Sequence, residues 1–318
     1  MIIKTPSYYK GFKCIAGACP DSCCQGWEVD ADEESLEYYK TLSGEIRVRI
    51  DSVLSEDEFG NTIFRLKEKK RCPFLNDENL CDMHIAIGGE HTPYTCRMFP
   101  RFLNVFGATT EMGISFSCPV AADIMFAQTE RLTLDSEMND APPELNEIDG
   151  ELYYYLLKAR EKAYDIIYDR SLPVTERVIK LLDFAAELQN EIEPYEEGSD
   201  ELGFFEVFNN KEVINPEWVE KVKNGKLGKV TDDYYNESIC AYFIFRYFMT
   251  AVFDCDILSK VKMAAIGVLI PACFGADSWT VHLWSKETEH SQYNMDRYKE
   301  LLKTAKCLNK DELKKLLM

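Results

Sequence analysis

The sequence has too few basic residues for a nucleic-acid-binding protein. Its 318 residues include 36 lysines and arginines against 55 aspartates and glutamates, which gives a formal charge of -19. A surface that binds nucleic acid must neutralise phosphates with lysine and arginine. We therefore expect no nucleic-acid partner. The acidic charge either forms a solvated surface that keeps the protein soluble or provides an acidic face for a lysine-rich or cationic protein segment.

A long apolar run free of charge is also missing. Residues 1–11 contain neither an apolar stretch of about seven residues nor a cleavage-site pattern, so we expect no secretory signal and a cytoplasmic location. The most apolar stretch, Ile239–Leu258, carries Arg246, Asp254 and Asp256. Each of these charges would cost about 2.5–3.5 kcal/mol at the centre of a bilayer. We expect a buried helix there and no membrane span.

Helical periodicity is scarce in the first part of the chain and frequent in the second. The acidic, proline-bearing stretch from Asp135 to Asp149 predicts a linker. Apolar residues then recur at helical spacing, which predicts helices over residues 151–168, 174–192, 217–224, 232–253, 257–271 and 295–317. We predict a mainly α protein. A small cysteine-rich, metal-binding domain with a short β-hairpin (residues 1–134) would pack on a helical domain (residues 135–318).

Short elements are predicted inside the cysteine-rich domain. Residues 32–42 begin with acidic side chains, which favour the first turn of a helix. Residues 61–66 alternate apolar and polar side chains, as a strand does, and residues 76–79 have the composition of a turn. We expect a small hairpin that displays Cys72 and Cys81 on either side of this turn.

Cysteine is the residue type that stands out by its distribution, because eight of the twelve lie within the first 118 residues. In a reducing cytoplasm, clustered cysteines are more typical of metal ligands or catalytic thiols than of disulfides. Thiolates this close in sequence repel one another unless a cation binds them. The alternative is a set of buried free thiols. The candidate ligands are Cys14, Cys19, Cys23, Cys24, Cys72, Cys81, Cys96 and Cys118.

The spacing of these cysteines does not decide which metal they bind. No Cys-x-x-Cys pair occurs, although Cys19 and Cys23 have an interval that structural zinc sites use. Iron–sulfur clusters also take four thiolates and tolerate varied spacings. Eight thiols could serve one site or two. The other four, Cys240, Cys255, Cys273 and Cys307, lie far apart in apolar helical segments, and we expect them to be small buried hydrophobic residues.

Charged and aromatic residues accompany the thiols. Arg97 and Arg101 could offset the negative charge of a thiolate-bound cluster or grip an anionic ligand; alternatively, they pair with surface carboxylates. His84 and His91 lie at ligand-like intervals from cysteines, but a lone histidine is more often a hydrogen-bonded structural residue.

The ordered motifs of this region resemble those of the flagellin lysine-N-methylase family, within a wider group of zinc- or iron-chelating domains named for a CxxCxxCC motif. The intervals between Cys14, Cys19 and Cys23 are four and three residues, which agrees with the methylase branch better than with the short chelating domains. The motifs are Phe12-Lys13-Cys14, Cys19, Cys23-Cys24, Cys72-Pro73-Phe74-Leu75, Cys81-Asp82-Met83-His84, Pro93-Tyr94-Thr95-Cys96-Arg97-Met98-Phe99-Pro100-Arg101 and Ser117-Cys118-Pro119.

This resemblance implies methyl transfer from S-adenosylmethionine to a lysine of a flagellin-like protein, assisted by an iron–sulfur cluster. We expect a 4Fe-4S cluster, with zinc as the alternative. Arg97 and Arg101 then become candidates to hold the carboxylate of the methyl donor, and Tyr94 and His84 weak candidates to accept the lysine proton. The oligomeric state is open.

Neither familiar scaffold for S-adenosylmethionine is present in the sequence. No Gly-x-Gly loop follows a predicted strand, and the radical signature Cys-x3-Cys-x2-Cys fails because position 26 is Gly26. A second hypothesis therefore stays open, namely a non-catalytic zinc- or iron-chelating module whose helical domain binds a partner. A redox protein is a third.

Overall fold

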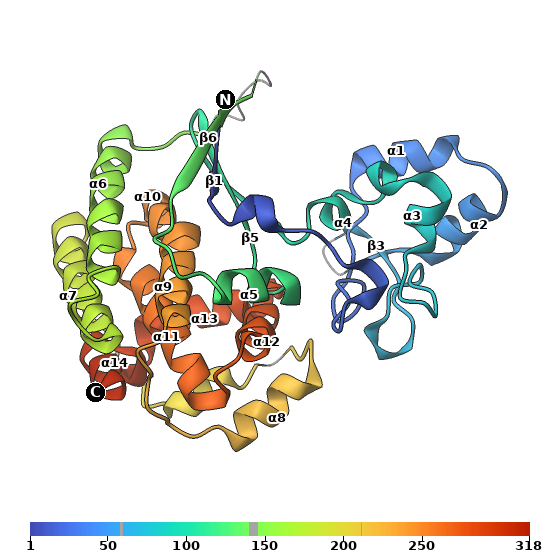
Figure 1. The fold of residues 1–318 in the computed structure, drawn as a ribbon. Coiled ribbons are helices and arrows are strands. Elements are labelled where there is room, and N and C mark those ends of the chain that lie inside the picture. The colour runs from blue at the N-terminus through green and yellow to red at the C-terminus, as the bar shows by residue number, and fades with distance from the viewer. Residues whose placement is uncertain (58–59, 140–145, 211) are drawn as a thin grey trace. The chain divides into compact units, whose positions relative to one another are not determined.

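The computed structural model describes residues 1–57, 60–139, 146–210 and 212–318, which form two compact units (Figure 1). The cysteine unit comprises Lys13–Phe102 and Cys118–Val120, and the helical unit comprises Met1–Phe12, Leu103–Ser117 and Ala121–Met318. The predicted class is confirmed: the structure is mainly helical, with a small sheet formed largely by N-terminal segments and a two-stranded hairpin.

The cysteine unit consists of short elements. The helix predicted over residues 32–42 is α1, where the Asp32 carboxylate caps the first turn by accepting a hydrogen bond of 3.0 Å from the Ser35 amide. The hairpin is formed by β2 and β3, which pair antiparallel with Leu54 opposite Phe64. The elements are η2 (Ala16–Ala18), α1 (Glu33–Thr41), α2 (Gly44–Val53), β2 (Leu54–Glu56), β3 (Thr62–Phe64), η3 (Glu68–Lys70), α3 (Asp82–Ile87), η4 (Gly89–His91) and α4 (Tyr94–Met98).

The hairpin does not display the two cysteines as predicted. The turn at residues 76–79 does form, closed by a hydrogen bond of 2.9 Å from the Asn76 amide to the Leu80 carbonyl. Beyond this turn, one isolated β-bridge between Leu75 and Cys81 joins the two sides of the chain, and no regular ladder forms. Asn76 explains the tight closure, because its side-chain oxygen also accepts from the Leu80 amide at 2.9 Å and thereby competes with a regular ladder.

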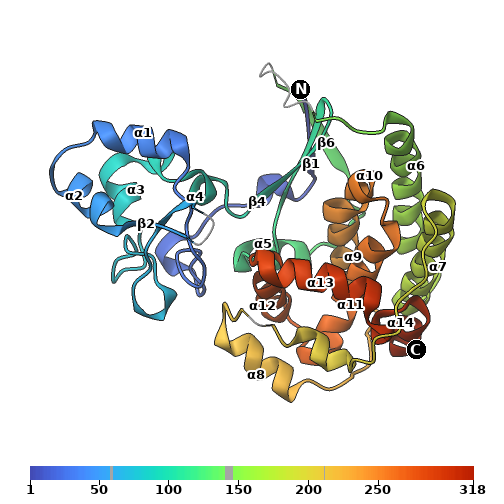
Figure 2. The same cartoon turned by 180° about the vertical axis from the view of Figure 1, so that it is seen from behind.

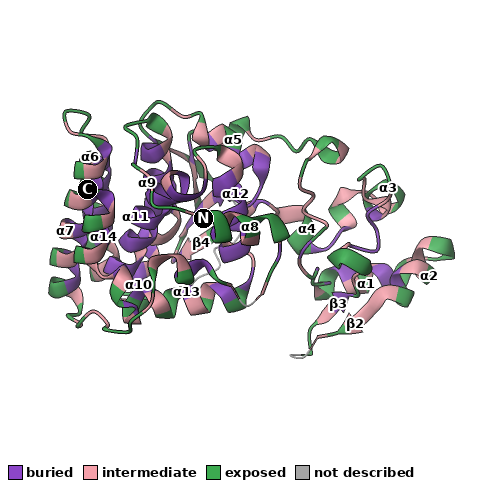
Figure 3. Cartoon of the chain, turned by 90° about the horizontal axis from the view of Figure 1, so that it is seen from below, coloured by how far each residue is buried: buried purple, intermediate pink, exposed green. Residues whose placement is uncertain are grey.

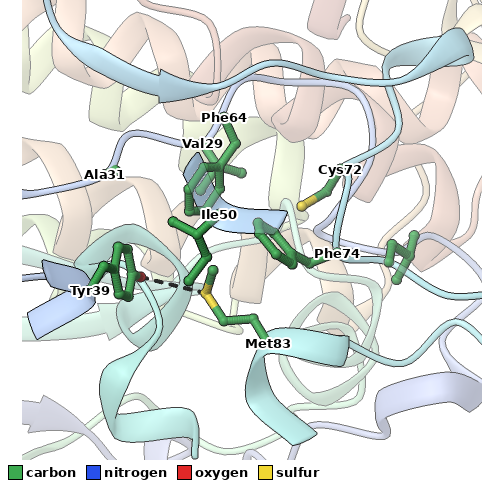
Figure 4. Packing of buried hydrophobic residues seen from close by; sticks show 9 residues of the cluster. Val29, Ala31, Tyr39, Ile50, Phe64, Cys72, Phe74 and Met83 are labelled. Carbon is green, nitrogen blue, oxygen red and sulfur yellow. Dashed lines mark hydrogen bonds between the residues drawn. The ribbon is translucent and has the colours of Figure 1, made fainter. Parts of the chain in front are cut away.

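The core of the cysteine unit is small and includes a thiol (Figure 4). Cys72 is 5% exposed and belongs to the buried cluster, while Cys24 and Cys81 pack against its edge. The Tyr39 hydroxyl points to the Met83 sulfur, 3.5 Å away. The buried members are Val29, Ala31, Tyr39, Ile50, Phe64, Cys72, Phe74, Leu75 and Met83.

A four-stranded sheet, in the order β4-β5-β1-β6, belongs mostly to the helical unit. Strand β1 (Ile2–Pro6) runs parallel to β5 (Thr109–Ile114) and antiparallel to β6 (Leu134–Met138), and β4 (Arg101–Phe106) pairs with β5 on its other side. The predicted boundary between residues 134 and 135 therefore differs from the observed units, because β1 and β5 join the helical unit.

The prediction of a linker from residue 135 was wrong at its start. Residues 135–138 belong to β6, whose side chains are mostly exposed, so the strand is held by its backbone pairing with β1 and needs no apolar pattern. Residues 140–145 of the predicted linker lie outside the described residues.

The predicted helices of the helical unit are present in the predicted order, but two of them are interrupted. The predicted helix over 232–253 is divided by η6, and that over 295–317 is divided by η7. Helix α12 was not predicted, because the polar residues that it buries hide any apolar stripe. The helices are α5 (Pro119–Phe126), α6 (Gly150–Ile167), α7 (Val174–Ile192), α8 (Pro216–Asn224), α9 (Tyr234–Tyr247), α10 (Ala251–Asp254), α11 (Ile257–Phe274), α12 (Ser278–Glu289), α13 (Gln292–Thr304) and α14 (Lys310–Leu317), with η1 (Tyr9–Gly11), η5 (Phe204–Phe208), η6 (Phe248–Thr250) and η7 (Lys306–Leu308).

Helix α11 is the centre of this unit. It is buried along nearly its whole length (Figure 3), and α9, α12 and α13 pack against it (Figure 2). A Cβ atom at Gly267 would lie 2.8 Å from side-chain atoms of Ile239 and Phe243, so glycine permits the close approach of α9. Within the described residues α11 is also the one helix long and apolar enough to cross a membrane; 94% of it is buried inside the protein, as in a core helix.

A buried ion pair joins the sheet to the helices. The Arg160 guanidinium on α6 donates hydrogen bonds of 2.7 and 2.6 Å to the Glu111 carboxylate on β5, and both side chains are at most 2% exposed. Burial by itself would lower the pKa of Arg160, but the Glu111 charge raises it above the usual value. Each charge therefore depends on the other.

We predict that Glu111→Gln destabilises the helical unit, because it leaves the Arg160 charge buried without its partner. The free energy of unfolding, measured by urea denaturation, should fall by about 3–5 kcal/mol. The control is Glu220→Gln, which removes an exposed carboxylate from Lys223 and should leave the free energy of unfolding unchanged. Equal losses in both variants would contradict this role.

Candidate metal centre

All eight N-terminal cysteines fall within the cysteine unit, on loops and in or beside short helices. Cys14 and Cys19 flank η2, and Cys23 and Cys24 follow in a loop. Cys81 caps α3, where its sulfur accepts a hydrogen bond from the His84 amide at 3.4 Å. Cys96 lies in α4, and Cys118 directly precedes α5. In the described chain none of the twelve cysteines is in a disulfide.

Backbone pairing brings the middle of this set together. The Cys72 amide donates to the Cys24 carbonyl at 2.8 Å, and the Gly26 amide donates to the Lys70 carbonyl at 3.0 Å. Two segments that lie far apart in sequence thus run side by side. The bridge between Leu75 and Cys81 then brings Cys81 back toward Cys72.

The first cysteine loop rests on the turn at residues 76–79. A Cβ atom at Gly17 would lie 2.7 Å from the Glu78 carbonyl oxygen, a distance that no side chain tolerates. Only glycine therefore lets the loop from Cys14 to Cys19 approach this turn so closely. Gly17 thereby allows the first cysteine loop to pack on this turn.

The thiols influence one another. A hydrogen bond with Cys24, together with burial and the nearby Cys96 and Cys14 thiols, raises the pKa of Cys23. Burial, followed by the Cys24, Cys72 and Cys81 thiols, raises the pKa of Cys96, although part of that residue is exposed.

The same holds for Cys72, which lies in the core, and for Cys81, which packs against the edge of the core. Burial and then Cys24 and Cys81 raise the pKa of Cys72 to about 12, and burial and then Cys24 raise that of Cys81. At least six of the eight predicted ligands are therefore electrostatic neighbours: Cys14, Cys23, Cys24, Cys72, Cys81 and Cys96. Cys19 donates a hydrogen bond to the Asp21 carbonyl at 3.2 Å, and Cys118 is 7% exposed.

These thiols suit a metal by donor type, but they do not form a closed coordination shell. Among the described residues, no group of three or more His, Cys, Asp or Glu side chains has the arrangement of a metal site. The donors themselves are soft sulfur ligands of the kind that zinc and iron–sulfur clusters take.

The other predicted site residues lie on α3, η4 and α4 and at the start of β4. Arg97 donates to the Glu90 carbonyl at 2.8 Å and to the Glu34 carboxylate at 3.3 Å. Tyr94 is 48% exposed, and its ring lies 6.0 Å from the Arg97 guanidinium carbon. His84 is exposed on α3, and Arg101 begins β4. The pairing of Arg97 with carboxylate and carbonyl agrees with the alternative stated for it.

His91 has a structural environment. Its ring stacks on Tyr38 with a centroid distance of 3.7 Å, and its carbonyl accepts from the Tyr39 hydroxyl at 3.1 Å. These contacts fit a residue that holds η4 against α1.

The prediction for the remaining cysteines holds for two of four. Cys240 and Cys273 are buried in the helical unit, whereas Cys255 and Cys307 are only partly covered. Cys255 adopts φ 53° at the end of α10, a backbone conformation that places it at a bend outside the helix core.

Sequence reasoning missed a second group of polar residues, in the helical unit. Ser115 and Ser117 follow β5 and form hydrogen bonds with Arg246 and His290, which lie on α9 and at the end of α12. The serines are buried, and they lie immediately before Cys118. The Ser-Cys-Pro motif was the only sequence signal near them, and it pointed to the thiol.

We predict that metal binding to the cysteine unit releases protons. The thiols with raised pKa values, including Cys72 at about 12, are protonated near neutral pH and must ionise to become ligands. The apparent affinity for Co²⁺ should therefore rise about tenfold per pH unit for each such thiol that binds. Competition against a chelator of known affinity over a range of pH measures the slope. A slope of zero would contradict thiol ligation.

Comparison with known proteins gives relatives that share part of the chain. The protein named Lysine-N-methylase of Salmonella typhimurium is 24% identical over 151 residues, covering 44% of this chain and 38% of the relative. Its counterpart in Salmonella choleraesuis is 24% identical over 159 residues, with the same coverage. The Flagellar biosynthetic protein FliU of Salmonella muenchen is 25% identical over 122 residues, covering 37% of this chain and 72% of the relative.

No family model matches the chain, and no solved structure is significantly similar to it. The matched part spans about two-fifths of the length of the lysine-N-methylases. Over less than half of its own length, then, this chain resembles proteins named as lysine-N-methylases and as a flagellar biosynthetic protein.

Proposed function

We propose that this protein is a metal-dependent protein-lysine N-methyltransferase that uses S-adenosylmethionine and acts on a flagellin-like protein. The observation that carries the proposal is the gathering of six thiols, from segments as distant as Cys14 and Cys96, in a chain that resembles lysine-N-methylases. An acidic chain with a formal charge of -19 favours a substrate that presents lysines.

The cysteine thiolates are the proposed ligands of an iron–sulfur cluster, with zinc as the alternative. Such a group, when bound, would supply a concentrated charge and, if one iron lacks a protein ligand, a position open to a carboxylate or amine. The thiols would hold it on the surface of the core that contains Cys72 and Phe74.

Arg97 is the proposed anchor for the carboxylate of the methyl donor. Its present carboxylate partner, Glu34, is 85% exposed and lies 3.3 Å away, an arrangement that contributes little stability. A ligand carboxylate can replace Glu34 at small cost and gain two parallel hydrogen bonds from the guanidinium. Arg101 is the second candidate for this role.

The transfer itself needs a neutral lysine amine. Free lysine has a pKa of about 10.4, so its ammonium must first give its proton to a base, for which Tyr94 and His84 are the candidates on this chain. The nitrogen lone pair then forms a bond to the methyl carbon as the carbon–sulfur bond of the sulfonium breaks. The products are methyllysine and the neutral thioether.

A second function, a metal-chelating module without catalysis, is favoured by one observation. Cys72 is part of the buried core, so a metal bound there would hold together a unit whose own core is small. This function predicts colourless protein loaded with zinc, and no methylated product.

Methyl transfer by anaerobically purified protein tests the proposal. The chain is incubated with S-adenosylmethionine and a lysine-bearing flagellar filament protein, and the intact mass of the acceptor is measured. We predict mass increases of whole methyl groups with the wild-type chain and their loss in Cys96→Ser, together with loss of the visible absorption of a cluster.

Cys273→Ser provides the matched control, because Cys273 is a buried cysteine of the helical unit. This variant should retain both the absorption and the transfer. Full methyl transfer by protein that contains no metal would refute the proposal.

A further inference from the structure

A cavity of about 600 Å³ lies within the helical unit, where the end of α7, the bend between α10 and α11 and the end of α13 meet. Every residue that lines it belongs to this unit. Its charged lining is strongly acidic, because carboxylates outnumber ammonium groups five to one. The carboxylates are those of Glu193, Glu196, Asp200, Asp254 and Asp256, and the ammonium group is that of Lys303.

The protein itself balances only part of this negative charge. The Lys303 ammonium pairs with the Asp256 carboxylate at 3.1 Å, and Lys260 pairs with Asp254 at 2.5 Å. The other three carboxylates, on residues 193, 196 and 200, form no ion pair with a basic side chain in the described parts of the chain. The cavity therefore keeps a net negative charge that a cation from outside can neutralise.

The walls of the cavity are fixed by contacts between its segments. Nε2 of Gln189 donates to the Glu193 carbonyl at 2.7 Å and to the Cys255 carbonyl at 2.8 Å, so one side chain joins α7 to the bend after α10. On the opposite side, a Cβ atom at Gly198 would lie 2.1 Å from the Thr304 carbonyl oxygen. Glycine thus allows the acidic loop to lie directly on the end of α13, and the cavity exists before any ligand enters it.

Two hydroxyls at the cavity have capacity for a further hydrogen bond. Tyr195 lines the cavity, and its buried hydroxyl lies beside that of Ser259, which is 3% exposed. Neither hydroxyl has another hydrogen-bond partner among the described residues. Ser259 also lines a smaller cavity of about 100 Å³, which shares Asp254 and Asp256 with the first. Buried polar groups with unused capacity cost free energy, and a ligand that supplies donors removes that cost.

An organic ammonium group suits this cavity better than a metal ion. No group of three or more His, Cys, Asp or Glu side chains in the described structure has the arrangement of a metal site. A volume of about 600 Å³ is also far larger than a single ion needs. A lysine side chain offers three N–H donors to carboxylate and hydroxyl oxygens, and its apolar stem can lie along Pro194 and Tyr195.

We propose that this acidic cavity is a docking site for a lysine side chain of the protein acceptor. Glu196 and Asp200 supply the opposing charge, and the Tyr195 hydroxyl accepts a hydrogen bond from the ammonium group. The inference rests on the proposed function and deepens it, because it states that the acceptor presents a lysine-bearing segment to the helical unit. Docking of this kind is binding only, and it requires neither the metal nor the methyl donor.

Fluorescence anisotropy tests the inference on the full chain, purified anaerobically and kept at physiological salt without a methyl donor. The probe is a labelled peptide of alternating lysine and serine, and the same peptide with glutamine in place of lysine is its control. The double variant Glu196→Gln/Asp200→Asn and the single variant Tyr195→Phe alter the cavity. The matched control is Glu161→Gln/Glu220→Gln, which removes two exposed carboxylates on α6 and α8, outside the cavity.

We expect Glu196→Gln/Asp200→Asn to weaken binding of the lysine peptide at least about fivefold, because two charge partners are lost. Tyr195→Phe should weaken it about threefold without lowering the melting temperature, since a hydroxyl with unused hydrogen-bonding capacity adds little to stability. The control variant should bind as the wild type does. In methyl transfer, the double variant should raise KM for the acceptor by the same factor and leave kcat unchanged.

Four results would overturn the inference: wild-type binding by Glu196→Gln/Asp200→Asn, an equal loss in the control variant, equal binding of the glutamine peptide, or binding of free spermidine without binding of the lysine peptide. Failure of the proposed function is distinguishable from these. A chain that binds the lysine peptide through the cavity but yields no methylated product refutes methyl transfer alone, whereas methyl transfer with an unchanged KM in the double variant refutes docking alone.

Discussion

Mutual destabilisation of closely held thiolates is the constraint on which the cysteine unit depends. Cys23, Cys72, Cys81 and Cys96 all have raised pKa values, caused by burial and by one another. A protein gains nothing from packing so many ionisable sulfurs together if they stay thiols, since apolar side chains would fill the same core better. A bound cation converts the repulsion into attraction, and it does so in a unit whose apolar core is otherwise small.

The helical unit is stabilised by a buried helix and a buried ion pair. Its central helix α11 is buried within the described structure, and the ion pair of Arg160 with Glu111 joins the sheet to the helices. Polar groups of α9 and α12 then fix the chain just before Cys118. These contacts hold residues 115–117 within the helical unit.

Much of the helical architecture could be predicted, because an amphipathic helix repeats its apolar residues at the spacing of the helical turn. The start and end of α7 were predicted to the residue, and the helix over 151–168 was shifted by one residue at each end. Helix α12 was not predicted, because it buries the polar residues His282, Lys286 and Glu287. The burial of these residues depends on partners that lie far away in the sequence. Strand β6 was not predicted either, because its stability comes from pairing with β1, a contact that amino-acid composition does not reveal.

The candidate site likewise contains residues that could be predicted from the sequence and residues that could not. The eight thiols could be identified from clustering alone, and the structure gathers them in one unit. The hydrogen bond between Ser117 and His290 could not be predicted, because residues separated by most of the helical unit in sequence meet only after folding. The role of Gly17 could be predicted only in part. Its neighbours in sequence indicate a tight loop, but they do not indicate the turn against which the loop packs.

The most direct test of the central claim is the metal and acid-labile sulfide content of the full chain after anaerobic purification. The account predicts metal bound to thiolates, with iron and sulfide in similar amounts if the centre is a cluster, and few thiols accessible to alkylation until the metal is removed. A folded, metal-free protein whose N-terminal thiols all react as ordinary cysteines, and which takes up neither iron nor zinc, would contradict it.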